Sequence, residues 1–108
     1  MSEKLYTYFE GFEFPADMPS DGILSRTILD NAAVRLVLFY FAAGQELSEH
    51  TAALPVMIHI LAGEARLELG SDVKAAHPGS TAYLPSGLRH AIFAQTQVVM
   101  LLELIKQP

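Results

Sequence analysis

The sequence predicts an all-β fold in which short strands close into a barrel. Short apolar runs are separated by Gly, Pro, Asn and Asp throughout its 108 residues, a pattern typical of strands joined by tight turns. Residues 34–42 are rich in β-branched and aromatic side chains, which suit a pleated and buried surface. Residues 64–69 alternate charged and apolar side chains, which is the two-residue period of a half-exposed strand. Little in the sequence favours helices.

The first 22 residues are predicted to form an irregular N-terminal arm. Five aromatic side chains in this segment need burial, whereas Pro15, Pro19 and Gly22 prevent a long strand or helix. We therefore expect one short strand in the arm, packed on the barrel or on a second subunit. Residues 23–108 are predicted to form a single barrel domain, because a chain of 108 residues has the commonest domain size.

The strands of the barrel follow one another with turn residues between them. Their predicted ranges are 23–29, 34–42, 56–61, 64–69, 73–75 and 97–105, with further strands between Gly79 and Pro85 and after His90. The residues around His50 are expected to form a loop. Eight or more short strands that close on themselves lose their exposed edges, and the arrangement they favour is a jelly-roll barrel.

The charge and composition argue against several classes of function. Seven basic against twelve acidic residues give a net charge of −5 without any Lys/Arg cluster, so no nucleic-acid partner is expected. The longest apolar run, residues 36–43, is too short to span a membrane. The chain contains no cysteine and its first residues do not resemble a signal peptide, which favours a cytoplasmic location.

The balance of apolar and charged residues predicts a second subunit. Hydrophobic residues make up 51% of the chain and charged residues 18%, which is an apolar composition for so short a chain. A partner subunit would cover part of the apolar surface that results. We therefore predict a homodimer.

The most informative motif spans residues 79–90. It begins with a turn glycine, followed after five residues by Pro85, which presets a hairpin. After one further residue comes Gly87, and after two more comes His90, which is directed back along the next strand. This spacing resembles the second motif of the cupin family, although Ala94 stands where that motif ends in asparagine.

Residues 44–63 resemble the first cupin motif in length and spacing, from one turn glycine to another. Cupins that bind a metal carry His-x-His and then a glutamate in this motif. Here His50 stands at the first histidine, whereas Ala52 and Val56 replace the second histidine and the glutamate. The resemblance covers residues 33–106 and implies a small single-domain cupin, a group in which many members have no assigned activity.

The resemblance implies a ligand site in the lumen of the barrel. Side chains alternate between the two faces of a strand, so Ala52 and Val56 are expected to face the lumen together with His50. By the same alternation, His59 should face the other side of its sheet. His90 from a neighbouring strand should meet His50 in the lumen. The residues predicted to line the pocket are Ala52, Val56, Ile58, Leu88 and Ile92.

His50 and His90 are the predicted metal ligands, since they stand at two of the four ligand positions of metal-binding cupins. Imidazole binds Mn, Fe, Ni or Zn, but two neutral ligands hold a divalent ion weakly. Other side chains would have to complete the site, and the candidates are Gln45, Glu46, Glu49 and Glu103. The donor set therefore slightly favours a barrel without a metal over one with a single divalent ion.

Two functions from different classes stay open. The first is noncatalytic binding of a small hydrophobic or amphiphilic molecule in the lumen. The second is a metal-dependent enzyme of dioxygenase or isomerase type, in which His50 and His90 hold the ion; no catalytic residue is assigned. The sequence favours the first, because the substitutions fall on ligand positions while the surrounding frame of the motifs is intact.

Overall fold

The computed structural model describes residues 5–12 and 20–106. Within these ranges the chain forms nine strands and no helix, which confirms the predicted all-β fold. The strands are β1 (Ile23–Asp30), β2 (Val34–Phe41), β3 (Glu46–His50), β4 (Val56–Ala62), β5 (Ala65–Leu69), β6 (Asp72–Ala76), β7 (Thr81–Leu84), β8 (His90–Ala94) and β9 (Val98–Ile105). The described residues include no helix that is long and apolar enough to cross a membrane.

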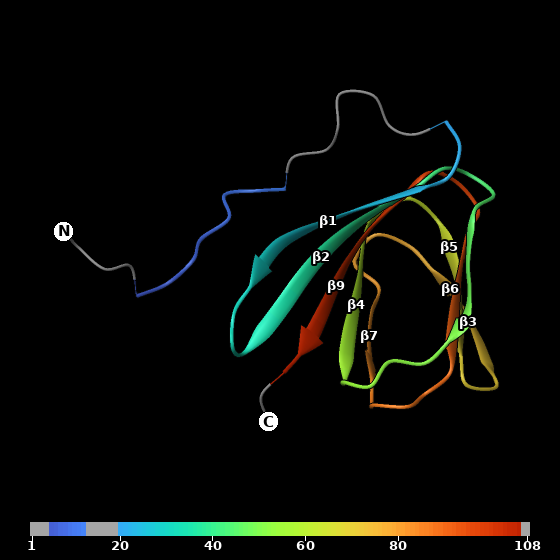
Figure 1. Ribbon diagram of the computed structural model, residues 1–108. Coiled ribbons are helices and arrows are strands. Elements are labelled where there is room, and N and C mark those ends of the chain that lie inside the picture. The colour runs from blue at the N-terminus through green and yellow to red at the C-terminus, as the bar shows by residue number, and fades with distance from the viewer. Residues whose placement is uncertain (1–4, 13–19, 107–108) are drawn as a thin grey trace.

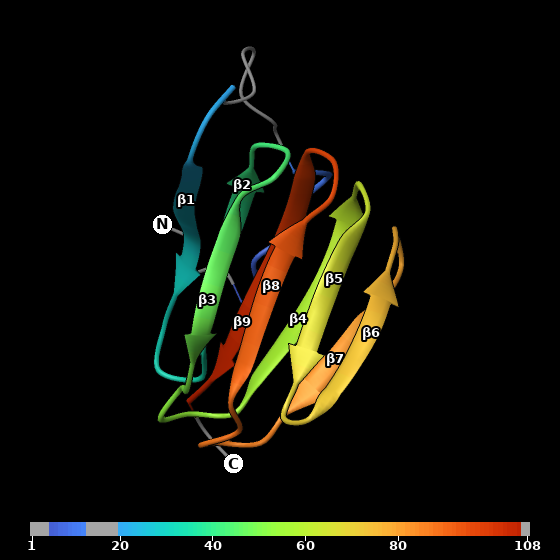
Figure 2. The same ribbon diagram turned by 90° about the vertical axis from the view of Figure 1, so that its right-hand side faces the viewer.

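The nine strands form two sheets that face each other (Figure 1). One sheet has five strands in the order β1-β2-β9-β4-β7, and the other has four in the order β3-β8-β5-β6. Every pair of neighbouring strands is antiparallel. In Figure 2 the four-stranded sheet lies in front, with β3 and β8 over β2 and β9. Because the chain passes repeatedly from one sheet to the other, the topology is that of a jelly roll.

Strand β3 corrects one expectation from the sequence. The residues around His50 were expected to form a loop, but residues 46–50 form a strand that pairs with β8. Leu47 lies opposite Ile92 in this pair and packs against the core. The segment forms a strand with a single apolar anchor because the ladder to β8 supplies backbone hydrogen bonds along one edge of β3.

The core lies between the two sheets and is filled by alternate side chains. On β4, Val56, Ile58 and Ile60 are 2%, 1% and 1% exposed, whereas the residues between them face away from the core. The same two-residue period holds on β5, where Ala65 and Leu67 are buried and Arg66 is exposed. The other buried members of this cluster are Phe41, Ala76, Leu84, Ile92, Ala94, Val98 and Met100.

The barrel is closed by core packing at one end and open at the other. On the inner face of β9, Val98 and Met100 are 0% and 1% exposed, whereas Leu102 and Leu104 are only partly buried although they pack against the same core. The open end therefore lies where β9 finishes. The β1–β2 turn, the last residues of β3 and the first residues of β4 and β8 lie at this end too.

The outer face of the five-stranded sheet carries a second, smaller apolar cluster. Its buried members are Leu38, Tyr40 and Val99, and Phe12 from the N-terminal arm packs against it. The predicted short strand of the arm is not found in residues 5–12, and residues 13–19 lie outside the described residues. In the part of the arm that the structure describes, Phe12 is therefore a side chain that docks onto the barrel.

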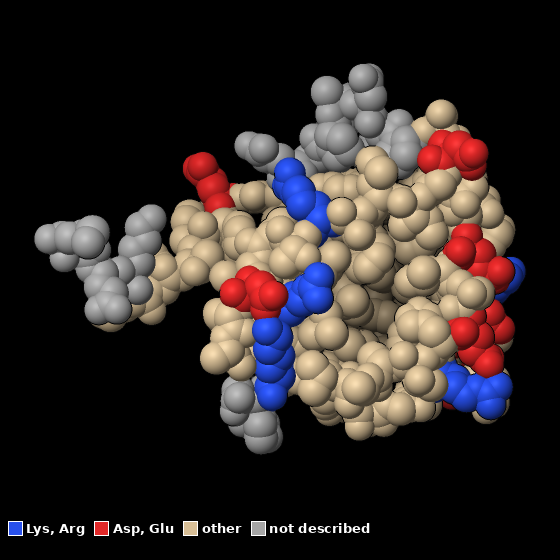
Figure 3. Space-filling view, viewed as in Figure 1, with Lys and Arg blue, Asp and Glu red and all other residues tan. Residues whose placement is uncertain are grey.

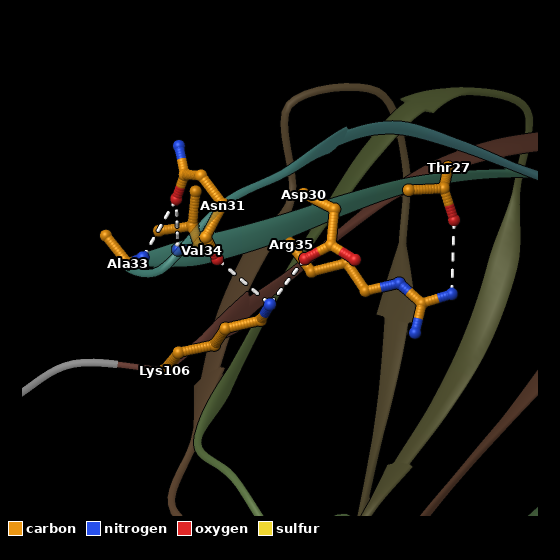
Figure 4. Close-up of polar contacts among 7 residues, drawn as sticks. All are labelled: Thr27, Asp30, Asn31, Ala33, Val34, Arg35 and Lys106. Atoms are coloured by element: carbon orange, nitrogen blue, oxygen red, sulfur yellow. Dashed lines mark hydrogen bonds and ion pairs between the residues drawn. The ribbon is translucent and has the colours of Figure 1, made fainter.

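The β1–β2 turn is fixed by side chains at the open end (Figure 4). Asn31 Oδ1 accepts hydrogen bonds from the backbone N–H groups of Ala33 and Val34, at 2.8 and 2.9 Å. Lys106, which follows β9, donates to the backbone carbonyl of Asn31 at 2.9 Å and forms an ion pair with Asp30. The hydrogen bond from Lys106 lowers the pKa of the Asp30 carboxyl. The last strand is thereby tied to the first turn.

Gly63 is the glycine whose replacement the fold tolerates least. It lies between β4 and β5 with φ of 87°, in the left-handed region that favours glycine. A Cβ at this position would lie 1.9 Å from the backbone oxygen of Gln97, in the β8–β9 turn. The turns that follow β4 and β8 therefore pack backbone to backbone at the closed end.

We predict that Gly63→Ala destabilises the fold by roughly 2–4 kcal/mol, because steric overlap adds to the backbone strain. Gly44→Ala is the matched control, since Gly44 has φ of 84° and nothing within 4 Å of its added Cβ. Backbone strain alone should cost the control about 1–2 kcal/mol. Urea unfolding of both variants measures the difference, and equal losses would contradict the close approach.

Candidate functional site

Two histidines from neighbouring strands meet at the open end of the barrel. His50 ends β3 and His90 begins β8, and the two lie opposite each other in the ladder between these strands. Their ring centroids are 4.2 Å apart and the ring planes meet at 60°. The register of β3 shifts between Leu47 and His50. Because of this irregularity, the side chains of Leu47 and His50 both face inward although the two residues are three positions apart.

Both rings are oriented by their own backbone. His50 Nδ1 lies 2.7 Å from the Ser48 carbonyl oxygen, and His90 Nδ1 lies 2.9 Å from the Leu88 carbonyl oxygen. A carbonyl oxygen only accepts hydrogen bonds, so each Nδ1 carries the proton and donates it. In the neutral rings the lone pair is therefore on Nε2, which makes each Nε2 a hydrogen-bond acceptor or a ligand donor.

The two rings differ in their surroundings. His90 is 4% exposed and is the only buried polar side chain among the described residues, whereas His50 is exposed. Burial lowers the pKa of His90 below its ordinary value of 6.5, against a smaller opposite effect of the Leu88 carbonyl, and His50 lowers it further. His90 is therefore neutral at pH 7 and can serve as an acceptor or as a base.

The residues predicted to line a pocket lie in the core between the sheets or against it. Val56, Ile58 and Ile92 are buried in this core. Ala52 and Leu88 are partly buried and pack against that core. The carbonyl of Ala52 accepts a hydrogen bond of 2.9 Å from the Gly87 N–H, which joins the loop after His50 to the hairpin before His90.

The wall opposite the histidines includes residues that the sequence analysis did not assign to the site. Leu102 and Leu104 lie on the inner face of β9 and stay partly exposed at the open end. On β2, Val37 pairs with Leu102, and Arg35 pairs with Leu104, so both share the inner face. The two-residue period of β9 predicts which of its residues share a face. Which of the two faces points inward is set by the strands that pair with β9.

Comparison with known proteins finds similarity in structure. No protein-family model and no curated protein matches the sequence. A conserved protein of unknown function from Streptococcus pyogenes is 26% identical, with a TM-score of 0.76, over 97% of this chain and 99% of that chain. An RmlC-like cupin from Desulfovibrio desulfuricans is 22% identical, with a TM-score of 0.78, over 92% of this chain and 98% of that one. The chain has the fold of a small cupin-type domain.

The cupin fold by itself does not fix the function of this domain. A salicylate 1,2-dioxygenase from Pseudaminobacter salicylatoxidans has a TM-score of 0.74 but is only 13% identical, over 81% of this chain and 28% of that chain. Solved structures similar in fold to this chain thus include an enzyme as well as a protein of unknown function. The activity depends on the residues of the site.

The carboxylates that lie near the histidines in the sequence do not face them. Glu49 Oε1 accepts two hydrogen bonds from Arg89, at 3.0 and 2.6 Å, on the outside of the barrel. Glu46 pairs with Phe93 on the outer face of the four-stranded sheet. The side chain of Gln45 donates to Asp21 at 2.9 Å.

His59 and Glu103 lie on the outer face of the five-stranded sheet, as the two-residue period predicts for His59. Their Nε2 and Oε1 atoms are 3.7 Å apart. In residues 5–12 and 20–106, no group of three or more His, Cys, Asp or Glu side chains is arranged to hold a metal ion. Two imidazoles alone do not fit the three or four protein ligands of an ordinary mononuclear site.

We predict that His90 makes the stability of the domain depend on pH. Because its pKa is lower in the folded state than in the unfolded state, the unfolded chain takes up a proton first as the pH falls. Stability should be complete above about pH 6.5 and should fall as the pH drops through the folded pKa. Urea unfolding between pH 8 and pH 5 measures this loss.

The variant His90→Gln should lose less stability than the wild type over the same pH range. His77→Gln is the control, since His77 is an exposed histidine between β6 and β7, and it should keep the wild-type profile. Parallel profiles for wild type and His90→Gln would show that His90 is not the group responsible.

Proposed function

We propose that this cupin domain binds a small molecule with an apolar body and a hydrogen-bond donor at the open end of the barrel. The observation that carries the proposal is the pair of Nε2 acceptors, one from His50 and one from His90, beside an apolar wall. A hydroxyl or N–H group of the ligand would donate to one or both acceptors. The ligand's apolar body would cover Leu102 and Leu104.

The energetics of this contact suit a modest affinity. Each methylene-sized group that is buried contributes about 0.8 kcal/mol, and each hydrogen bond adds about 0.5–1.5 kcal/mol net. The loss of translational and rotational freedom on binding offsets several kcal/mol of this gain. A ligand of six to eight heavy atoms is therefore expected to bind with a Kd between about 10 μM and 1 mM.

A metal-dependent enzyme of dioxygenase or isomerase type is the second candidate. It is favoured by the anchoring of each Nδ1 on a backbone carbonyl, because histidines that bind a metal through Nε2 are oriented in the same way. The set of two donors does not fit a resident ion, so binding without a metal has the stronger support.

The binding proposal is tested with ligand pairs that differ in one donor. Phenol and anisole, and benzyl alcohol and its methyl ether, are titrated by NMR in the presence of EDTA. We expect the hydroxyl compounds to bind about three- to tenfold more tightly than the ethers, because only they donate to Nε2. The double variant His50→Leu/His90→Leu should lose this preference.

His59→Leu is the matched control for the binding test, since it removes a histidine from the outer face of the barrel. It should keep the preference of the wild type for the hydroxyl compounds. If His59→Leu abolishes the preference, or if ethers and hydroxyl compounds bind the wild type equally, the histidine pair is not the recognition element.

Metal content separates the two candidate functions. Untagged protein incubated with Mn, Fe, Ni or Zn and then desalted should retain far less than one equivalent by mass spectrometry, because two imidazoles bind a divalent ion weakly. Retention of about one equivalent by the wild type, lost in His50→Leu/His90→Leu, would favour the enzyme.

A further inference from the structure

Arg35 places a positive charge at the open end of the barrel. It pairs with Leu104 of β9, and paired residues of an antiparallel ladder share one face of the sheet. Leu104 packs against the core between the sheets, so Arg35 extends from the inner face. Its Nη2 donates to Thr27 Oγ1 at 3.2 Å (Figure 4). Thr27 pairs with Val37 and lies on the same inner face.

The charge of Arg35 is only partly offset by the described carboxylates: it helps Lys106 to lower the pKa of Asp30, the residue opposite it in the ladder. Its guanidinium forms no ion pair with any described Asp or Glu. Asp30, its partner in the β1–β2 ladder, is engaged by Lys106 in an ion pair. Lys106 also donates to the Asn31 carbonyl. The three charged groups, Asp30, Lys106 and Arg35, therefore leave a surplus of one positive charge.

Arg35 and the histidines lie on opposite walls of the open end. Arg35 belongs to β2, and His50 and His90 belong to β3 and β8, which lie over β2 and β9 in Figure 2. His50 and His90 place two acceptors on the four-stranded sheet, and Arg35 places a cation on the five-stranded sheet that faces it. Figure 3, viewed as in Figure 1, shows charged side chains over the five-stranded sheet and over the four-stranded sheet, with uncharged surface between them.

We propose that the ligand is a small monocarboxylic acid and that Arg35 binds its carboxylate. This inference rests on the binding function proposed above and adds the ligand class. The planar fork of a guanidinium matches the two oxygens of a carboxylate. The far end of the ligand carries a hydroxyl or N–H group that donates to His50 or His90. An apolar body about the size of one six-membered ring separates the two ends.

The same geometry disfavours other anions. A dicarboxylic acid would place its second carboxylate against the Nε2 atoms of His50 and His90. These atoms carry no proton in the neutral rings, so they cannot donate a hydrogen bond to it. A phosphate group carries between one and two negative charges at pH 7, more than the single surplus charge at Arg35. With a net charge of −5, the chain as a whole repels anions, so the local charge of Arg35 must provide the recognition.

The test compares each acid with its neutral amide. The probes are 4-hydroxybenzoate with 4-hydroxybenzamide, and 6-hydroxyhexanoate with 6-hydroxyhexanamide, titrated by calorimetry or NMR in the presence of EDTA. For the wild type we expect the acid of at least one pair to bind about tenfold more tightly than its amide. Arg35→Gln should reduce this ratio to about one, and Arg35→Lys should give an intermediate ratio because it keeps the charge without the fork.

Arg26→Gln is the matched control, because Arg26 pairs with Leu38 on the outer face of the sheet. It should keep the wild-type ratio of acid to amide affinity. Circular dichroism and urea unfolding verify that each variant is folded. Equal binding of acids and amides by the wild type, or an unchanged ratio in folded Arg35→Gln, would overturn this inference and leave small-molecule binding standing. Failure of all four probes to bind would overturn both proposals.

Discussion

The two sheets are held face to face by the apolar side chains that β4 and β9 direct between them. These strands are neighbours in the five-stranded sheet, where Ile58 lies opposite Leu102 and Ile60 opposite Met100. A slip of one residue would place His59 or Glu103 in the core, so the alternation fixes the register of the whole sheet. It also fixes which side chains are left at the open end, where the same two strands extend beyond the closely packed region.

The candidate site depends on a local departure from this regularity. The register shift in β3 allows Leu47 to anchor the strand in the core and His50 to reach the ring of His90. Without it, one of the two side chains would turn outward. The backbone carbonyls of Ser48 and Leu88 then hold both rings with Nε2 free. Backbone geometry thus places a polar pair at the open end of an apolar barrel, and the proposed binding function depends on that pair.

Most of the fold was predictable from the sequence because it depends on the two-residue alternation within strands and on the turn residues between them. The apolar runs and turn residues placed eight of the nine strands, and alternation placed His59 on the outer face. Strand β3 was missed because its residues are mostly polar and its pairing with β8 is a long-range contact. The inner position of Arg35 was missed for a similar reason, since the face of β2 is set by β9, which is distant in sequence.

The central position of β9 has a consequence for how the chain acquires its structure during synthesis. Strand β2 and strand β4 both pair with β9, which leaves the ribosome after both of them. Until then, the hairpin of β1 and β2 and the strand β4 each present an open edge and an uncovered apolar face. Such late, long-range pairing makes folding slow and exposes aggregation-prone surface. The nascent chain therefore has to keep these edges apart from other chains until β9 emerges.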